Sequence, residues 1–349
     1  MGAHVVDRLD AVIIGAGPCG LAAAIAFKRA GMRAVVIDRS CIVSGVAGYP
    51  TYITFFSTPD RLSIGDVPFI VATEKPTRRD ALAYYRAVTT LFDLDVRQYE
   101  NVERVRRCDD AFLVESRTRH GALRETRARA VVVATGYFGH PNRLHVPGED
   151  LPHVTHQFTE GHWAFRQDVV VVGGGNSAVE AALDLYRSGA RVTVVHFGPQ
   201  LDPNIKPWVL PDITNRMKEG SIGARFGARV RAITPEHVEL DTPNGVDRAR
   251  ADHVYLMVGY QPNAELLVQL EVPIDPRTGI PAHDPATMET AVPGVFIAGV
   301  IASGNDANKT FIENGRFHGD LIVRRLAADS PGASRRPATA PGSRTSRHA

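Results

Sequence analysis

Cysteine is scarce in this chain of 349 residues, which contains only Cys19, Cys41 and Cys108. The number is odd and the spacings are unrelated to one another, so the sequence predicts neither a disulfide framework nor a zinc site. A few free thiols are typical of a protein from a reducing compartment. We therefore expect a cytoplasmic protein that binds no metal.

Long apolar runs and an excess of one charge are also missing. No apolar run approaches the ~18 residues that a bilayer span needs, and the first predicted strand begins too early to leave room for a leader segment. Hydrophobic residues make up 44% of the chain and charged residues 22%, which is ordinary for a soluble globular protein. These features predict no membrane association.

The formal net charge of +2 does not indicate nucleic-acid binding, because it comes from the C-terminal tail. Residues 328–349 carry four arginines against one aspartate, a net charge of +3, which leaves the rest of the chain near −1. This tail is rich in Pro, Ser, Ala and Gly and lacks apolar periodicity. We expect it to be disordered.

Two glycine-rich loops stand out against this background. The first follows the apolar run 11–14 and precedes an Ala-rich helix over 21–30. Its predicted cofactor contacts are Gly15, Gly17, Pro18 and Gly20. Glycine at these positions permits a tight turn, the close approach of a pyrophosphate, and helix-to-strand packing. The next strand ends in Asp38, where a carboxylate would bind ribose hydroxyls, so we expect an adenosine with a free 2′-hydroxyl.

The second loop follows the apolar run 169–172 and opens a helix that continues through Tyr186. Its predicted cofactor contacts are Gly173, Gly175, Asn176 and Ser177. The next strand ends in His196 where the first unit has an acid. A carboxylate there would repel a 2′-phosphate, whereas His196, with Lys206 or Arg191, could neutralise one. The second site therefore favours NADPH over NADH, and the sequence leaves open which cation is responsible.

Further segments predict how the chain passes between the two units. The strand 129–133 leads into Ala134, Thr135 and Gly136, a turn that we expect beside the first cofactor. A matching strand within 252–263 closes the second unit. Residues 294–300 then resemble a return strand into the first unit, and a helix over 310–326 follows. The second unit is thus predicted to be inserted into the first.

We predict an α/β fold with two Rossmann-like dinucleotide-binding domains. The first domain is expected to be discontinuous, over 1–138 and 264–327. The inserted domain is expected over 139–263, and the disordered tail over 328–349.

Five segments carry a family resemblance that is more specific than the glycine loops. They are 15–20, 49–57, 64–69, 206–212 and 304–315. Together they resemble the bacillithiol disulfide reductase family of thioredoxin-reductase-like flavoproteins, over about Asp10 to Leu326. The resemblance implies FAD on the discontinuous domain, NADPH on the inserted domain, and a homodimer.

One absence narrows the expected chemistry. A thioredoxin reductase needs a Cys-x-x-Cys pair just before its second glycine loop, yet residues 152–168 contain no cysteine. Thioredoxin reduction by that dithiol is therefore excluded. The resemblance implies an NADPH- and FAD-dependent oxidoreductase that returns a small-molecule thiol disulfide, bacillithiol disulfide, to its thiol form.

Cys19 is the candidate catalytic residue, because a thiol could relay electrons through a mixed disulfide. It lies at a helix N-terminus, whose dipole lowers a thiol pKa, and beside expected phosphate charges, which raise it. The alternative interpretation is that Cys19 is simply a small packing residue. We interpret Cys41, which follows the strand ending at Asp38, as a small buried hydrophobic residue, and we assign no role to Cys108.

Two departures from thioredoxin-reductase-like proteins affect the expected cofactor contacts. The usual His-Arg pair after the second-domain strand is His196-Phe197 here, which removes one ligand for a 2′-phosphate. The usual Gly-Asp after the return strand is Gly299-Val300, which leaves the flavin ribityl contact to backbone groups or to Asp306. Lys309 is a further polar candidate for the flavin or the substrate.

Two other functions are compatible with these features. A ferredoxin–NADP reductase of the thioredoxin-reductase-like type also lacks the dithiol, but it needs a face that docks an acidic protein. A non-catalytic flavin- or NADPH-binding sensor would not need both glycine loops intact.

Overall fold

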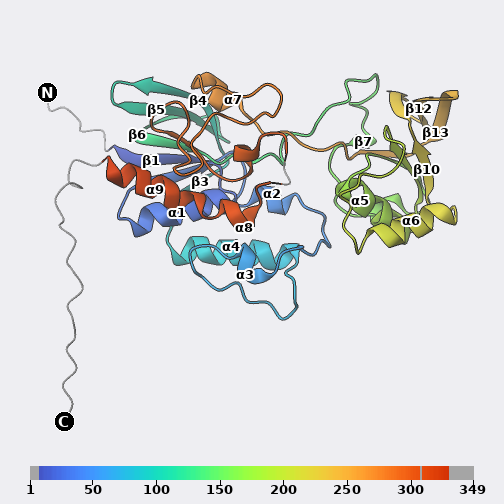
Figure 1. The fold of residues 1–349 in the computed structure, drawn as a ribbon, viewed down its shortest axis with the longest axis horizontal. Coiled ribbons are helices and arrows are strands. Elements are labelled where there is room, and N and C mark those ends of the chain that lie inside the picture. The colour runs from blue at the N-terminus through green and yellow to red at the C-terminus, as the bar shows by residue number, and fades with distance from the viewer. Residues whose placement is uncertain (1–7, 307–308, 330–349) are drawn as a thin grey trace, which may run out of the picture.

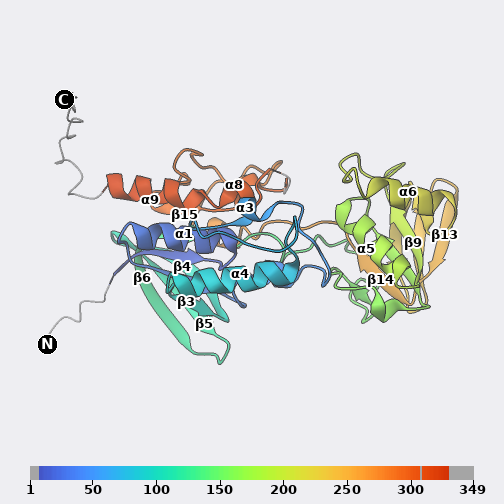
Figure 2. The same ribbon diagram turned by 90° about the horizontal axis from the view of Figure 1, so that it is seen from below.

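The computed structural model describes residues 8–306 and 309–329. These residues form two lobes that lie side by side along the longest axis and are joined by two crossing segments (Figure 1). The first lobe holds the elements from both ends of the chain, and the second lobe holds those from the middle. The same separation is visible after a rotation of 90° (Figure 2).

The first lobe is built on a sheet in the order β3-β2-β1-β6-β5-β4, with β15 also paired to β6. The parallel part consists of β1 (Leu9–Ile14), β2 (Ala34–Asp38), β3 (Val96–Gln98) and β15 (Val295–Ile297) around β6 (Leu123–Val133). Strands β4 (Glu100–Cys108) and β5 (Ala111–Thr118) extend the first half of β6 as an antiparallel meander. Parallel strands covered on both faces need continuous apolar runs, and Ala11, Val12 and Ile13 are fully buried.

The pairing of β15 with β6 explains how the lobes are connected. The chain leaves the first sheet after Val133 and re-enters it at Val295, which pairs with Val131. The predicted insertion of one unit into the other is therefore confirmed.

Helices α1 (Pro18–Arg29) and α9 (His318–Ala328) lie side by side against this sheet (Figure 2). They cross so closely that a Cβ at Gly319 would collide with the backbone of Ala23. The lobe is completed by α2 (Ser44–Ala47), α3 (Pro59–Leu62), α4 (Arg78–Leu91), α7 (Glu265–Gln269), α8 (Ile312–Gly315) and the 3₁₀ turn η2 (Val300–Ser303). Helix α4 begins with a capping box between Thr77 and Asp80.

The single helix predicted over 310–326 is wrong, because the chain breaks between α8 and α9. Asn314 uses its side chain on nearby backbone, accepting from the Phe311 N–H at 2.8 Å and donating to the Lys309 carbonyl at 2.9 Å. These bonds fix the start of α8, whose N-cap is Phe311. Gly315 then packs directly against Gly299, where no side chain would fit.

The second lobe contains a fully parallel sheet in the order β10-β9-β8-β14-β7. Its strands are β7 (Val154–Thr155), β8 (Asp168–Val172), β9 (Arg191–His196), β10 (Gly223–Phe226) and β14 (His253–Leu256). Helices α5 (Asn176–Arg187) and α6 (Leu210–Lys218) and the 3₁₀ turn η1 (His162–Ala164) belong to the same lobe. An antiparallel sheet of β11 (Arg229–Ile233), β12 (His237–Thr242) and β13 (Gly245–Arg250) shares an apolar core with β8, β9 and β14.

The two crossing segments are bonded to each other. Pro141 and Tyr260 form an antiparallel bridge, Asn142 N donates to Gly259 O at 3.0 Å, and Gln261 N donates to His140 O at 2.9 Å. The ring of Tyr260 also stacks on Phe138, with centroids 4.7 Å apart. The connection between the lobes is therefore a short two-stranded ribbon.

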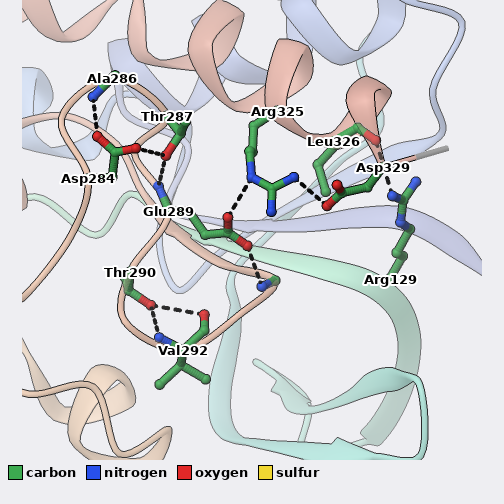
Figure 3. A network of polar contacts seen from close by, with 11 residues as sticks. Arg129, Asp284, Ala286, Thr287, Glu289, Thr290, Val292, Arg325, Leu326 and Asp329 are labelled. Atoms are coloured by element: carbon green, nitrogen blue, oxygen red, sulfur yellow. Dashed lines mark hydrogen bonds and ion pairs between the residues drawn. The ribbon is translucent and has the colours of Figure 1, made fainter. Parts of the chain in front are cut away.

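Polar contacts join the segment before β15 and strand β6 to helix α9 (Figure 3). The Glu289 carboxylate accepts from Arg325 Nε at 2.8 Å and from the Gly294 N–H at 2.9 Å. Arg129 on β6 donates to the Leu326 carbonyl at 3.1 Å. These bonds connect β6, the segment before β15, and α9.

None of the helices in the described ranges combines the length and the apolar character required to cross a bilayer. Helix α9 extends to Ala328, one residue into the segment predicted as tail, and residues 330–349 lie outside the described part of the chain.

Candidate functional site

The first glycine loop lies where β1 ends and α1 begins, and its shape matches a pyrophosphate cradle. Gly15 has φ +113°, and a Cβ there would collide with the Ala134 carbonyl. At Gly17, by contrast, a Cβ would meet nothing within 4 Å. Gly17 is the N-cap of α1, Pro18 follows it, and no side chain caps the helix. The free N–H groups and open space fit a bound phosphate.

Asp38 lies at the carboxyl end of β2, beside this loop. Its two carboxylate oxygens accept from the Ala16 N–H at 2.7 Å and the Ser40 N–H at 2.8 Å. Each oxygen keeps a further lone pair. The carboxylate is thus held in one orientation and can still accept from ribose hydroxyls.

The turn after β6 meets the same loop. Ala134 N donates to Ile14 O at 2.8 Å, and Thr135 Oγ1 donates to the Asn263 carbonyl at 3.5 Å. Gly136 has φ +66° with open space around its Cα. The structure therefore brings the predicted residues Ala134, Thr135 and Gly136 to the first loop.

The Cys19 side chain points toward η2 and α8. A Cβ added at Gly315 would lie 2.8 Å from Cys19 Sγ, and one added at Gly299 would lie 3.2 Å from it. Both glycines therefore leave space for the thiol. Burial raises the pKa of Cys19 to about 12, so the thiol is protonated at neutral pH.

His318 supports the same wall of the site. The Gly299 N–H donates to His318 Nδ1 at 3.2 Å, which requires an unprotonated Nδ1. Burial and, to a smaller extent, the charge of His283 lower the pKa of His318 to about 4. His318 is therefore neutral at physiological pH, and no motif in the sequence marks it as part of the site.

Asp306 and Lys309 form an ion pair with Nζ 3.5 Å from Oδ2. Asn308, between them, lies outside the described residues. The Glu313 carboxylate on α8 accepts a hydrogen bond from the Ser57 hydroxyl, and Arg61 donates to its Oε2 at 3.1 Å. The bond to Ser57 joins 49–57 to 304–315, two of the segments that carry the resemblance.

The second glycine loop repeats the geometry of the first. Gly173 has φ +138°, and a Cβ there would collide with the Met257 carbonyl, as at Gly15 and Ala134. Gly175 is the N-cap of α5, which again has no side-chain cap, and Ser177 is exposed in the first turn. Asn176 bonds to the Asn204 carbonyl and the Lys206 N–H, both at 3.0 Å. The loop thus offers a second phosphate cradle.

The His196 ring does not lie where its place at the end of β9 predicts. The ring is 4% exposed and packs beneath the second loop, so that a Cβ at Gly174 would lie 2.5 Å from it. Its Nε2 is 3.4 Å from Asp202 Oδ1, and its buried Nδ1 has no partner within the described residues. In this structure His196 supports the loop from below and does not face a 2′-phosphate.

Asp202 is a carboxylate that the strand-end pattern missed. Its N–H donates to the Gly174 carbonyl at 3.0 Å, and its Oδ2 would lie 3.3 Å from a Cβ at Gly175. A chain reversal after β9 returns it to the loop, which strand periodicity alone does not predict.

The Lys206 ammonium already has two partners in this structure. Its Nζ is 2.9 Å from Glu180 Oε1 and 2.8 Å from the ring centroid of Phe56 in the first lobe. Burial lowers the pKa of Lys206, against the opposing effect of Glu180. Lys206 therefore connects the lobes here.

Arg191, the other cation considered, is at the wrong end of its strand. It begins β9 and binds Asp168 through two bonds of 2.7 and 2.8 Å. The cofactor edge of a parallel sheet is at the carboxyl ends of the strands. Arg191 is therefore excluded as a ligand for a 2′-phosphate.

Comparisons with known proteins agree with this geometry. The profile of the family described as pyridine nucleotide-disulphide oxidoreductase matches residues 12–299. The chain is 47% identical over 320 residues to bacilliredoxin reductase Bdr of Bacillus subtilis, with 91% of this chain and 97% of the relative covered.

Solved structures give the same result. Bacillithiol disulfide reductase Bdr from Bacillus cereus matches with a TM-score of 0.91 at 46% identity, over 93% of this chain and 100% of that chain. The Staphylococcus aureus protein of the same name matches with a TM-score of 0.87 at 42% identity, over 92% and 98%. Thioredoxin reductase from T. acidophilum shares the fold at 22% identity, with a TM-score of 0.69 over 92% and 98%.

The predicted fold class and the family resemblance are both confirmed. The fold is thioredoxin-reductase-like, and the chain is an oxidoreductase that uses FAD and a nicotinamide dinucleotide. By sequence and by structure, it belongs to the Bdr family within the pyridine nucleotide-disulphide oxidoreductases.

Proposed function

We propose that this protein reduces bacillithiol disulfide with NADPH. The main support is its 46% identity to the Bacillus cereus bacillithiol disulfide reductase across the whole of that chain, with a TM-score of 0.91. Two intact phosphate cradles agree with a two-cofactor enzyme. Each turnover consumes one NADPH, one proton and one disulfide, and releases NADP⁺ and two thiols.

The first lobe holds FAD in this proposal, and the second holds NADPH. The FAD contacts are Gly15, Gly17, Pro18, Gly20, Asp38, Ala134, Thr135, Gly136, Gly299, Asp306 and Lys309. The NADPH contacts are Gly173, Gly175, Asn176 and Ser177, with His196 beneath the loop and Lys206 beside it. When bound, the flavin supplies the two-electron chemistry between nicotinamide and disulfide. The corresponding domains are 1–138 with 264–327, and 139–263.

Cys19 is proposed as the thiol that forms a mixed disulfide with the substrate. Residues 152–168 contain no cysteine, and Cys19 is the one thiol in the first glycine loop. Its pKa of about 12 means that a proton must leave Sγ before attack. The attack would form one S–S bond, break another, and release the first thiolate.

A second acceptor is indicated by the Bacillus subtilis relative, whose name specifies bacilliredoxin. That name implies a protein disulfide in place of a small one. The ferredoxin alternative has weaker support, because the matching curated ferredoxin–NADP reductase is 28% identical. A cytoplasmic location and a homodimer complete the proposal.

The test is anaerobic NADPH oxidation by the FAD-loaded protein with each acceptor in turn. We expect turnover with bacillithiol disulfide. Turnover with ferredoxin alone would overturn the substrate assignment. Turnover with oxidised bacilliredoxin alone would show that the substrate is a protein disulfide and not bacillithiol disulfide. Lack of NADPH oxidation with every acceptor, including ferricyanide, would favour the non-catalytic sensor.

The role of Cys19 is tested with Cys19→Ala in the same assay. The variant should lose disulfide turnover and keep ferricyanide reduction, which needs no thiol. Cys108→Ala is the matched control. Disulfide turnover that persists in Cys19→Ala would make Cys19 a packing residue. Alkylation of Cys19 by iodoacetamide should accelerate up to about pH 12, because only the thiolate reacts.

A further inference from the structure

The second cofactor site lacks the cation that selectivity for NADPH requires at the end of β9. Phe197 follows this strand, and its side chain cannot bind a phosphate. His196 lies beneath the loop, Lys206 pairs with Glu180, and Arg191 pairs with Asp168. A cation from another element must therefore supply the charge.

The neighbouring strand provides one. Strands β9 and β10 run parallel, with Phe226 in register with His196, so both end at the same edge of the sheet. Beyond this register Ala228 N donates to His196 O at 3.1 Å, and Gly227 N donates to Gly198 O at 2.8 Å. These bonds hold the start of β11 against the residues after β9. Arg229 is the first residue of β11.

The Arg229 guanidinium lies over the ring of Phe197, with Cζ 5.1 Å from the ring centroid. The ring is 63% exposed, so the pair faces solvent at the cofactor edge. A guanidinium held over an aromatic face by a cation–π contact leaves its N–H groups free to donate, which suits the binding of a phosphate. The Phe197 ring therefore helps to position the Arg229 guanidinium.

Arg229 is also uncommitted. Within the described residues it has no carboxylate partner, whereas Arg225, Arg231 and Arg248 pair with Asp247, Asp241 and Glu239. A free guanidinium at this edge is available to a dianionic ligand.

We propose that Arg229, held on Phe197, binds the 2′-phosphate of NADPH and determines the preference over NADH. The inference depends on the proposed NADPH site and adds the residue that reads the phosphate. It assigns to Phe197 a positioning role, since that ring sets the direction of the guanidinium.

The test compares binding of NADPH, NADH, 2′,5′-ADP and 5′-AMP to the FAD-loaded protein by titration calorimetry. In Arg229→Ala we expect affinity for NADPH and 2′,5′-ADP to fall by about tenfold or more, and affinity for NADH and 5′-AMP to stay unchanged. Arg229→Lys should restore part of the loss. Arg248→Ala, which also removes one exposed positive charge from this lobe, is the matched control and should leave all four affinities unchanged.

Phe197→Ala separates the positioning role from the charge. It should weaken 2′,5′-ADP binding less than Arg229→Ala does, and it should have no further effect when Arg229 is already alanine. Equal 2′,5′-ADP affinities in wild type and Arg229→Ala would overturn the inference.

The two proposals fail in different ways. If wild type prefers NADPH and Arg229→Ala keeps that preference, the assignment of Arg229 is wrong while the NADPH site stands. If wild type prefers NADH, the cofactor choice itself is wrong, and Asp202 becomes the residue to test as a ribose ligand.

Discussion

Lys206 of the second lobe lies over the ring of Phe56 in the first, with Nζ 2.8 Å from the ring centroid. Trp208 packs on the same ring at 5.7 Å, and Lys75 of the first lobe lies 5.1 Å from the Trp208 ring centroid. The two rings thus lie between two cations, and the four residues come alternately from the first and the second lobe. Because Phe56 and Trp208 are both exposed, each cation–π contact contributes about 0.5–1 kcal/mol.

Phe56→Ala should therefore reduce the preference for this arrangement of the lobes. We expect small-angle scattering to show a broader distribution of interatomic distances than in wild type. Phe165→Ala removes an exposed ring whose contacts, Arg166 and Gly189, lie within the second lobe, and should leave the distribution unchanged. Identical curves for Phe56→Ala and wild type would show that other contacts hold the lobes.

Asp38 anchors the first loop through Ala16 and Ser40. Asp38→Ala should weaken FAD binding by about 1.5–3 kcal/mol, roughly ten- to a hundredfold, because the charge-assisted hydrogen bonds expected from the ribose hydroxyls to the carboxylate are lost. Flavin fluorescence during reconstitution of the apoprotein measures this. Asp66→Ala removes an exposed carboxylate paired with Arg29 and should bind FAD normally. Unchanged FAD affinity in Asp38→Ala would contradict the assignment.

His318 should make the protein acid-sensitive. Its pKa falls from 6.5 to about 4 on folding, so the unfolded chain binds a proton between these values and the native protein does not. The stabilisation is present above about pH 6.5 and is lost as the pH falls toward 4, on the order of 3 kcal/mol in total.

His318→Asn should lose less stability between pH 7 and 4 than wild type, measured by urea denaturation. Asparagine can still accept from the Gly299 N–H and does not titrate. His120→Asn, at an exposed turn, should follow the wild-type profile. If His318→Asn and wild type lose stability in parallel, the neutral histidine has no such effect.

Glu289 is at the centre of the polar contacts that join the segment before β15 to α9. Glu289→Gln keeps an acceptor for the Gly294 N–H but removes the charge facing Arg325, so we expect a loss of about 1–3 kcal/mol in unfolding free energy. Glu74→Gln, at an exposed position, provides the comparison in the same urea titration. Equal midpoints for the two variants would mean that the ion pair contributes no net stability.

Local pattern predicted most of the fold. Both β-strand, glycine-loop and helix units form as expected, because an apolar strand run and the glycine spacing after it each leave a strong sequence signal. The break after Gly315 was missed, because it accompanies the packing of Gly315 against Cys19 and Gly299, which no local pattern describes.

The site residues likewise divide into those whose position follows from local pattern and those whose position depends on distant parts of the chain. Asp38 meets the first loop because its place is set by strand register. Lys206, Asp202 and Arg229 take their positions from loops and from a neighbouring sheet, which no periodicity describes. Burial of Cys19 likewise depends on Gly299 and Gly315, which are far away in the sequence.

The paired crossing segments limit how the lobes can move. Two separate tethers would permit swivelling about several axes, but the bonds between Asn142 and Gly259 and between Gln261 and His140 make both strands turn as one strip. Any relative motion of the lobes would then have to bend or twist this one ribbon, and neither crossing segment could move without the other.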